Sequence, residues 1–268
     1  MGTGARGAGG RTGGTRVAAA RTVDGRVRVD TAGGLLACRR LPDEDGSVRV
    51  ALVATEALLL AGDDVRITVD VGADVALEVV EVTGTVAYDM QGGSAAWAVD
   101  VRVGAGGRLV WDALPFVVAT GARVHRTATL DLAEGACAVL RETFVLGRSH
   151  EAGGHLTTTT RAHLADRPLL VETLVVDPAA WADPAVLGGN RCLDTVTVLG
   201  ARLDGDDLPV ADDPGRDVLQ LDRPGTLVRS VGTDAHAGDL ADVVSHARRA
   251  CGLRTGALPA MAGHRGPR

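Results

Sequence analysis

The chain of 268 residues carries 34 acidic and 28 basic side chains, a formal net charge of −6, and 46% of its residues are hydrophobic. This balance excludes a dedicated nucleic-acid binder, whose affinity would come from many basic contacts to phosphates. The sequence contains no lysine, which excludes Schiff-base catalysis and the lysine of a phosphate-binding P-loop. Aromatic residues make up only 2% of the chain, so Val, Leu and Ala must fill the core, and the many Val and Thr residues favour strands.

The N-terminus is rich in glycine and arginine. Its first sixteen residues contain three arginines, seven glycines and no acid. Such a segment buries too little apolar surface to fold. We therefore predict a disordered tail over residues 1–22, a single β domain over residues 23–254 and a flexible C-terminal tail over residues 255–268.

The four cysteines are far apart in the chain and form no CxxC pair: Cys38, Cys137, Cys192 and Cys251. This spacing is typical of reduced thiols in a cytosolic protein rather than of a zinc site or a disulfide framework. The longest apolar runs are far short of the ~20 residues that span a bilayer. No apolar segment follows the N-terminal arginines as it would in a secretion signal. We predict a cytoplasmic protein that does not contact a membrane.

Short strands with a two-residue apolar period dominate the first half of the chain. Residues 26–30 and 48–52 are predicted strands. Residues 62–64 then form a turn into residues 65–71, whose odd positions are apolar and even positions polar, as in a half-buried strand. Further along, Pro115 is restricted to a sheet edge, a strand start or a bend.

A unit of strand, turn and strand recurs along the chain. Its Gly-Ala turns begin at residues 72, 104 and 135, which are 32 and 31 residues apart, and residues 166–168 stand where a fourth turn would fall. In an all-strand chain such a period means that each hairpin stacks on the one before and buries its apolar face there. We predict an all-β fold with a few short helices, built as a β-helical, solenoid-like stack of sheets. A β-sandwich with coincidental spacing is the alternative.

One substantial helix is predicted near the C-terminus, over residues 240–250. Asp239 is placed to cap it, and Gly252 to end it. One face of the helix is apolar and would pack on the outside of the sheets: Leu240, Val243, Val244, Ala247 and Cys251. Shorter helical turns are predicted after Asp177 and Asp183, because each precedes a proline.

Histidines supply a candidate metal cluster, since His150, His155 and His163 lie within fourteen residues. On one extended strand, His155 and His163 would be about 27 Å apart at ~3.3 Å per residue, so they share an ion only if the chain folds back. A metal-dependent small-molecule enzyme would need the three side chains to converge in one pocket. A solvated polar strand face is the alternative.

Several short motifs follow one another between residues 26 and 252. In chain order they are LLLAGDDV (58–65), VGADVAL (71–77), VTGTVAY (82–88), GAGGRLV (104–110), Leu114-Pro115, Gly121-Ala122, LDLAEGA (130–136), Glu142, Gly147-Arg148 and GTLVR (225–229) before the C-terminal helix. Their order and spacing resemble the urease accessory protein UreD family, called UreH in some organisms. After Gly147-Arg148 the family has a short spacer and Gly-Glu, whereas this chain has residues 149–154 ending in a double glycine.

The resemblance implies a maturation factor that is not an enzyme. Such a protein binds urease apoprotein, the helical factor UreF and the GTPase UreG, with a dimer of these heterocomplexes as the larger assembly. It assists nickel insertion into urease, and it binds no cofactor tightly, because nickel is in transit. The family's β-helical fold agrees with the repeat. The alternatives are the metal-dependent enzyme above and a generic β-solenoid binding module.

The resemblance also singles out individual positions. Asp63, Glu142 and Glu172 fall where the family carries acidic residues, and it implies that some of them line an internal route for nickel. A turn cap for Asp63 and a salt bridge from Arg141, Arg148 or Arg161 to Glu142 are the structural alternatives. Five further motif positions are assigned structural roles: Gly62, Pro115, Gly121, Gly147 and Arg148.

Overall fold

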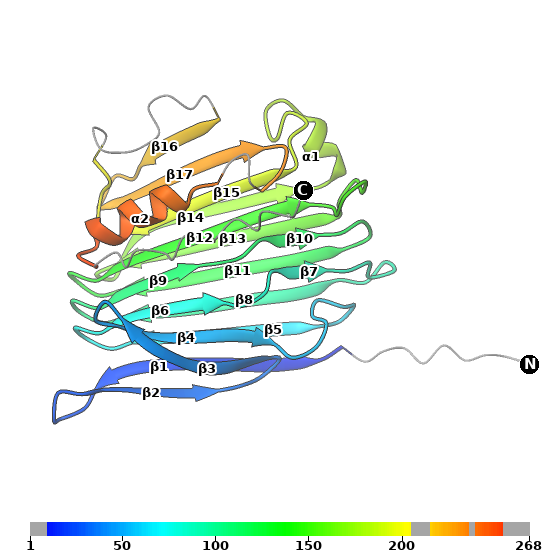
Figure 1. The fold of residues 1–268 in the computed structure, drawn as a ribbon. Coiled ribbons are helices and arrows are strands. Elements are labelled where there is room, and N and C mark those ends of the chain that lie inside the picture. The colour runs from blue at the N-terminus through cyan, green and yellow to red at the C-terminus, as the bar shows by residue number, and fades with distance from the viewer. Residues whose placement is uncertain (1–9, 205–214, 236–238, 254–268) are drawn as a thin grey trace, which may run out of the picture.

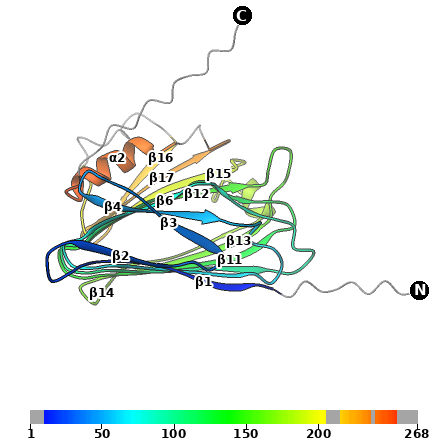
Figure 2. The same ribbon diagram turned by 60° about the horizontal axis from the view of Figure 1, so that its bottom comes forward.

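The computed structural model of the chain describes residues 10–204, 215–235 and 239–253. Strands account for 55% of the described residues and helices for 6%, so the predicted all-β class is confirmed. The strands form two sheets that lie face to face (Figures 1 and 2).

Seven strands make up sheet A, in the order β14-β13-β11-β8-β5-β1-β2. Their bounds are β1 Thr12–Arg21, β2 Val27–Ala32, β5 Asp64–Val71, β8 Ala95–Val103, β11 Arg123–Leu132, β13 His155–Leu164 and β14 Arg167–Val176. Sheet B runs in the order β16-β17-β15-β12-β9-β6-β4-β3, with β10 pairing with β12 and β7. Its strands are β3 Leu36–Glu44, β4 Ser47–Ala54, β6 Ala76–Glu81, β7 Thr85–Ala87, β9 Arg108–Asp112, β10 Phe116–Val118, β12 Cys137–Leu146, β15 Cys192–Leu199, β16 Arg216–Gln220 and β17 Gly225–Gly232.

The middle of the chain winds as a solenoid. Each coil gives one strand to sheet A and the next to sheet B, in the pairs β5 and β6, β8 and β9, and β11 and β12. Strands of successive coils pair in parallel, so the predicted stack is confirmed. The prediction that the two strands of each unit form a hairpin is wrong, however, because these strands lie in different sheets. A sharp turn looks the same in sequence whether it reverses a strand within a sheet or carries the chain to the next layer.

The three Gly-Ala turns align along one edge of the stack, on the left in Figure 1. Gly104 N donates to Val71 O at 2.7 Å, and Asp74 N donates to Ala105 O at 3.0 Å. A Cβ atom on Gly104 would lie 2.8 Å from Ala73 N, so this close stacking requires glycine. At the fourth position the repeat stops, because β13 and β14 form an antiparallel hairpin within sheet A.

The N-terminal segment contains a strand where we predicted disorder. β1 pairs in parallel with β5, from Thr12 opposite Asp64 to Ala19 opposite Val71, and Val17 and Ala19 are buried. The predicted tail over residues 1–22 is therefore wrong for residues 12–21. The strand needs little apolar surface of its own, because β5 supplies a ready backbone template. Residues 1–9 and 255–268 lie outside the described residues.

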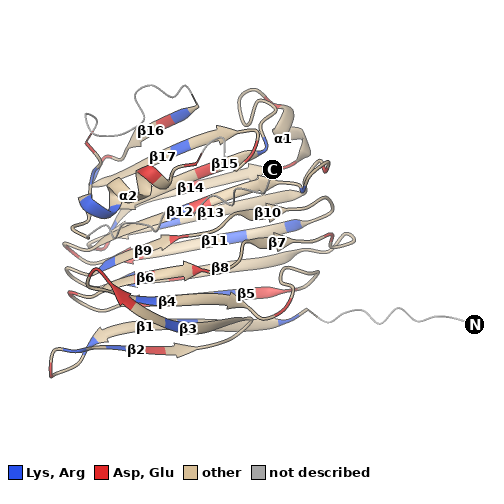
Figure 3. Ribbon diagram, viewed as in Figure 1, with Lys and Arg blue, Asp and Glu red and all other residues tan. Residues whose placement is uncertain are grey.

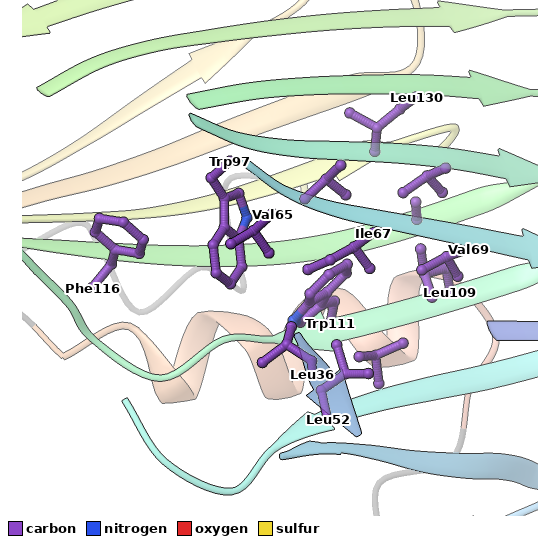
Figure 4. Close-up of a cluster of buried hydrophobic side chains, with 14 of the residues drawn as sticks. Leu36, Leu52, Val65, Ile67, Val69, Trp97, Leu109, Trp111, Phe116 and Leu130 are labelled. Atoms are coloured by element: carbon purple, nitrogen blue, oxygen red, sulfur yellow. The ribbon is translucent and has the colours of Figure 1, made fainter. Parts of the chain in front are cut away.

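The main core lies between the two sheets. Val65, Ile67 and Val69 of β5 are fully buried, which confirms the predicted alternation, and they face Leu109 and Trp111 of sheet B (Figure 4). No helix in the described ranges is long and apolar enough to span a bilayer. The short helix α1 (Pro178–Ala182) begins as predicted, with the Asp177 side chain accepting hydrogen bonds from the Ala179 and Ala180 amides.

A second core lies on the outside of sheet B. The helix α2 (Ala241–Ala250) buries its apolar face there, against β12 and β15 (Figure 2). The N-cap of α2 is Leu240, which makes no side-chain capping hydrogen bond, so the prediction that Asp239 caps the helix is wrong. Asp239 lies one residue earlier, and its Oδ1 accepts a hydrogen bond from Ala241 N at 2.9 Å. A disulfide joins Cys137 to Cys251, with their Cα atoms 5.8 Å apart, so the prediction of reduced thiols is wrong for this pair. The two cysteines are 114 residues apart, and spacing alone does not reveal connectivity.

Candidate functional site

The interior between the sheets changes from apolar to polar along the stack. Val65, Trp97, Arg126 and Thr158 are register partners on successive strands of sheet A. The next inward ladder is Ile67, Val99, Ala128, Thr160 and Glu172. Charged residues lie on β11, β12 and β17 as well as in the turns (Figure 3). A polar or charged side chain at a core position destabilises the fold unless it forms a hydrogen bond or an ion pair. We therefore expect each of these side chains to have a polar partner in the interior.

Arg126 points from β11 into the middle of the polar interior. Its Nη2 atom donates to Glu142 Oε1 at 2.8 Å, and only 12% of its side chain is exposed. Glu142 thus has an arginine partner, but the predicted choice of Arg141, Arg148 or Arg161 is wrong. Its guanidinium carbon lies 4.6 Å from the ring centre of Phe116, 4.8 Å from that of Phe144 and 5.7 Å from that of Trp97. Three aromatic faces and a carboxylate therefore hold this cation.

Glu81 is a second carboxylate in the same region. Its oxygens accept hydrogen bonds from Trp111 Nε1 at 3.0 Å and from Leu114 N at 3.1 Å. Burial raises the pKa of Glu81, and these hydrogen bonds and the nearby Arg126 only partly offset that rise. Glu81 is therefore easier to protonate than an exposed glutamate.

Glu172, further along the stack, pairs with Arg229 across the two sheets. Small cavities of ≈ 30, ≈ 20 and ≈ 10 Å³ lie along this interior, which is room for individual water molecules. Glu142 lines all three cavities, whereas Arg126 and Glu81 line two of them and Glu172 lines the third. Glu142 thus stands where the two halves of the polar interior meet.

A larger cavity of ≈ 260 Å³ lies where sheet B is interrupted between β9 and β10. Pro115 is in this interruption, directly before β10, which confirms its predicted place at a bend or strand start. The lining includes Asp112, Leu114, Arg141 and Asp239, and Ala113 is shared with two of the interior cavities. Burial raises the pKa of Asp112, and Arg141 opposes that rise. We call this cavity the side mouth.

Arg141 also braces the outer face of sheet B. It donates to Asp194, with Nε 3.1 Å from each carboxylate oxygen, and to Asp239 Oδ1 at 2.8 Å. Asp194 is 1% exposed and also accepts hydrogen bonds from Thr143 Oγ1 at 2.9 Å and Leu240 N at 3.2 Å. This network ties α2 to two strands of the sheet.

Asp63 lies at a turn, away from the polar interior, and it lines none of the four cavities described above. Its carboxylate is 2% exposed and accepts hydrogen bonds from Arg11 Nε at 2.9 Å and Leu60 N at 3.0 Å. The adjacent Gly62 has φ +85°, a conformation that favours glycine. The turn role, which was the structural alternative for Asp63, matches this environment.

Hydrogen bonds to Glu151 hold the loop that follows β12. Glu151 accepts hydrogen bonds from Arg148 Nε at 2.8 Å, Arg148 N at 3.0 Å and Thr120 N at 3.2 Å, and those from Arg148 contribute most to lowering its pKa to about 2. Gly147 has φ +74°, and a Cβ there would lie 2.7 Å from Glu151 O. Gly121 likewise has φ +81° and packs on Asp89. The left-handed backbone of both glycines and the Arg148–Glu151 contacts fix the local shape of these turns.

The three histidines do not converge. His155 begins β13 and His163 lies near its end, on one face of the strand, where His163 Nδ1 is 3.0 Å from Asp131 Oδ1. His150 lies in the preceding loop with φ +65°. Among the described residues, no group of three His, Cys, Asp or Glu side chains is arranged to hold a metal ion. The arrangement that the enzyme alternative requires is therefore not formed by these residues.

The fold and its interior together define a two-sheet β-solenoid with paired carboxylates and arginines along its axis and a mouth in one sheet. A model of the family described as UreD urease accessory protein matches residues 12–262. The chain belongs to this family, which confirms the resemblance seen in the sequence motifs.

Individual relatives agree with this membership. The chain is 46% identical over 226 residues to urease accessory protein UreD 1 of Streptomyces griseus subsp. griseus, covering 83% of this chain and 86% of that protein. It is 33% identical over 210 residues to urease accessory protein UreD 3 of the same organism, covering 75% and 82%. It is 33% identical over 222 residues to urease accessory protein UreD of a Parafrankia species, covering 74% and 75%.

Proposed function

We propose that this chain is a non-enzymatic urease maturation factor that passes nickel through its interior to urease apoprotein. It acts in the cytoplasm in a complex with UreF and UreG, and the GTPase chemistry belongs to UreG. Membership of the UreD family supports the maturation role. The observation that carries the conduit is the position of Glu142, which lines three neighbouring cavities between the sheets.

The chemistry of the interior suits a divalent cation in transit. Carboxylate oxygens and water are acceptable ligands for a borderline ion such as Ni²⁺. Glu142 and Glu172 are partly buried, so a passing ion is incompletely screened by solvent, and each is paired with an arginine that neutralises it when no metal is near. Single carboxylates in water-sized cavities bind weakly, which allows the ion to leave again.

Uncovered apolar surface supports a role in a complex. Val171 and Val175 of β14 are 66% and 56% exposed, and Leu219 of β16 is 49% exposed. β14 and β16 are the last strands of the two sheets at the same end of the stack (Figure 1). Apolar side chains on free sheet edges are typical of surfaces that a partner covers.

The conduit is tested by replacing Glu142 and Glu172 separately with glutamine. Each variant is assembled with UreF, UreG and urease apoprotein, and the nickel content and activity of the urease are measured. We expect complex assembly to be unchanged and the nickel content to fall by about tenfold, the scale of effect seen when a group that supports a metal site is lost. Glu134→Gln, on an exposed turn, is the matched control and should load urease normally. Normal nickel loading with both interior variants would refute the conduit.

A further inference from the structure

The few aromatic side chains of this chain are concentrated around one cation. The sequence holds two phenylalanines and three tryptophans, and both phenylalanines and Trp97 present their rings to Arg126. Trp97 and Phe116 meet edge to face with their ring centres 5.9 Å apart, and Phe116 and Phe144 do so at 6.1 Å. Figure 4 shows Trp97 and Phe116 beside the apolar core. The rings thus form one continuous wall on which the guanidinium rests.

Trp97 adds a second, independent observation. The residue is 4% exposed, and its Nε1–H group has no hydrogen-bond acceptor among the described residues. Trp97 lines the same two cavities as Arg126 and Glu81. A buried donor without an acceptor is costly. The Trp97 donor lies in a cavity wall, so it points to a bound ligand that supplies oxygen atoms, such as the water molecules around a cation.

We propose that this cage is a binding site for a hydrated divalent metal cation and that Arg126 is its gate. The guanidinium occupies the space beside Glu142 and Glu81, and the metal ion enters when the guanidinium leaves Glu142. This inference rests on the conduit proposed above and adds its control point. It assigns a positioning role to Arg126 and a cation-site role to Glu81, which no motif suggested.

The charges explain why a gate is needed at this place. With Arg126 in position, Glu142 is neutralised, and the guanidinium repels a second cation. Without it, Glu81 and Glu142 would face the cavity together, and two carboxylates retain a divalent ion that one carboxylate would release. An arginine stays protonated at any physiological pH, so this gate opens by displacement and not by titration. Removal of the arginine should therefore convert a site that releases the ion into a site that retains it.

The test compares Arg126→Met with the parent chain. Nickel affinity of each purified protein is measured by equilibrium dialysis, and the fluorescence of the cavity tryptophans reports whether the ion reaches the cage. We expect Arg126→Met to bind one nickel ion about tenfold more tightly or better, and the added change Glu142→Gln to abolish the gain. Arg102→Met is the matched control, because Arg102 is 72% exposed on the outer face of sheet A, and its nickel affinity should equal that of the parent.

A folded Arg126→Met protein with the nickel affinity of the parent would overturn the gate. If the methionine variant does not fold, Arg126→Gln decides. Glutamine keeps a polar side chain toward Glu142 but removes the positive charge, so a nickel affinity raised above that of the parent supports the gate, and an unchanged affinity overturns it. The conduit fails separately, when Glu142→Gln and Glu172→Gln load urease as the parent does. In the activating complex, the methionine variant should retain nickel and deliver less of it to urease.

Discussion

Replacing Asp194 with alanine is expected to lower the free energy of unfolding by about 3–5 kcal/mol, as for other buried ion pairs that lose one partner. The carboxylate is 1% exposed and accepts hydrogen bonds from Arg141, Thr143 and the Leu240 amide. The variant leaves Arg141, whose side chain is 12% exposed, without its closest counter-charge. Urea unfolding followed by circular dichroism measures the change.

The matched control for Asp194 is Asp217→Ala, an exposed aspartate on β16, which should change the unfolding free energy by less than about 0.5 kcal/mol. Loss of the network should also release α2 first, because Leu240 precedes the first turn of that helix. Hydrogen exchange of the α2 amides would detect this release. An unfolding free energy within about 1 kcal/mol of the parent would show that the network contributes little.

The second large effect concerns Asp63, where alanine is expected to cost about 2–3 kcal/mol of unfolding free energy. The structure explains why this exceeds the cost of an ordinary turn residue. Burial opposes ionisation of Asp63, but hydrogen bonds from the Arg11 side chain and from the Leu60 and Arg11 amides outweigh it, so its pKa is lowered. Since Arg11 precedes β1, the change should loosen β1 from β5.

The lowered pKa of Asp63 predicts how stability depends on pH. A group whose pKa is lower in the folded state stabilises the fold above its unfolded value of 3.8, and this stabilisation is lost as the pH falls through the folded pKa. Asp63→Ala should therefore flatten the acid limb of stability measured below about pH 4. Asp64→Ala, at a more exposed neighbour that pairs with Arg66, serves as the control. Equal acid limbs for the parent and Asp63→Ala would contradict the prediction.

Local patterns were sufficient to predict much of the fold. The alternation over residues 65–71 identified a half-buried strand, and the turns at Gly72, Gly104 and Gly135 identified the repeat. What the patterns could not specify was the partner of each strand. A hairpin and a solenoid coil share the same turn and differ only in which distant backbone accepts the hydrogen bonds. The strand over residues 12–21 was missed for the same reason, because its template is β5.

The candidate site was predictable in part. Glu142 and Glu172 were selected by motif, and the structure places both between the sheets. Arg126 and Glu81 were missed, although a signal existed. Arg126 stands at the inward parity of β11 between Val124 and Ala128, and Glu81 continues the inward parity of β6. A charge at an apolar position indicates a buried partner. The partner of Arg126 lies on the opposite sheet and those of Glu81 lie on or beside a neighbouring coil, so the sequence could not supply the geometry.

The two ends of the solenoid differ from its middle in strand direction. A parallel coil exposes at each end the same row of amides and carbonyls that its interior uses, so a second molecule of the same chain would find a ready surface on which to continue the pattern. β2 and β3 reverse the direction at one end, and β14 does so at the other. An incoming coil of the repeat would meet a strand that runs opposite to the coils of the interior. We expect the reversed strands to oppose end-to-end continuation of the solenoid, as capping repeats do in other repeat proteins.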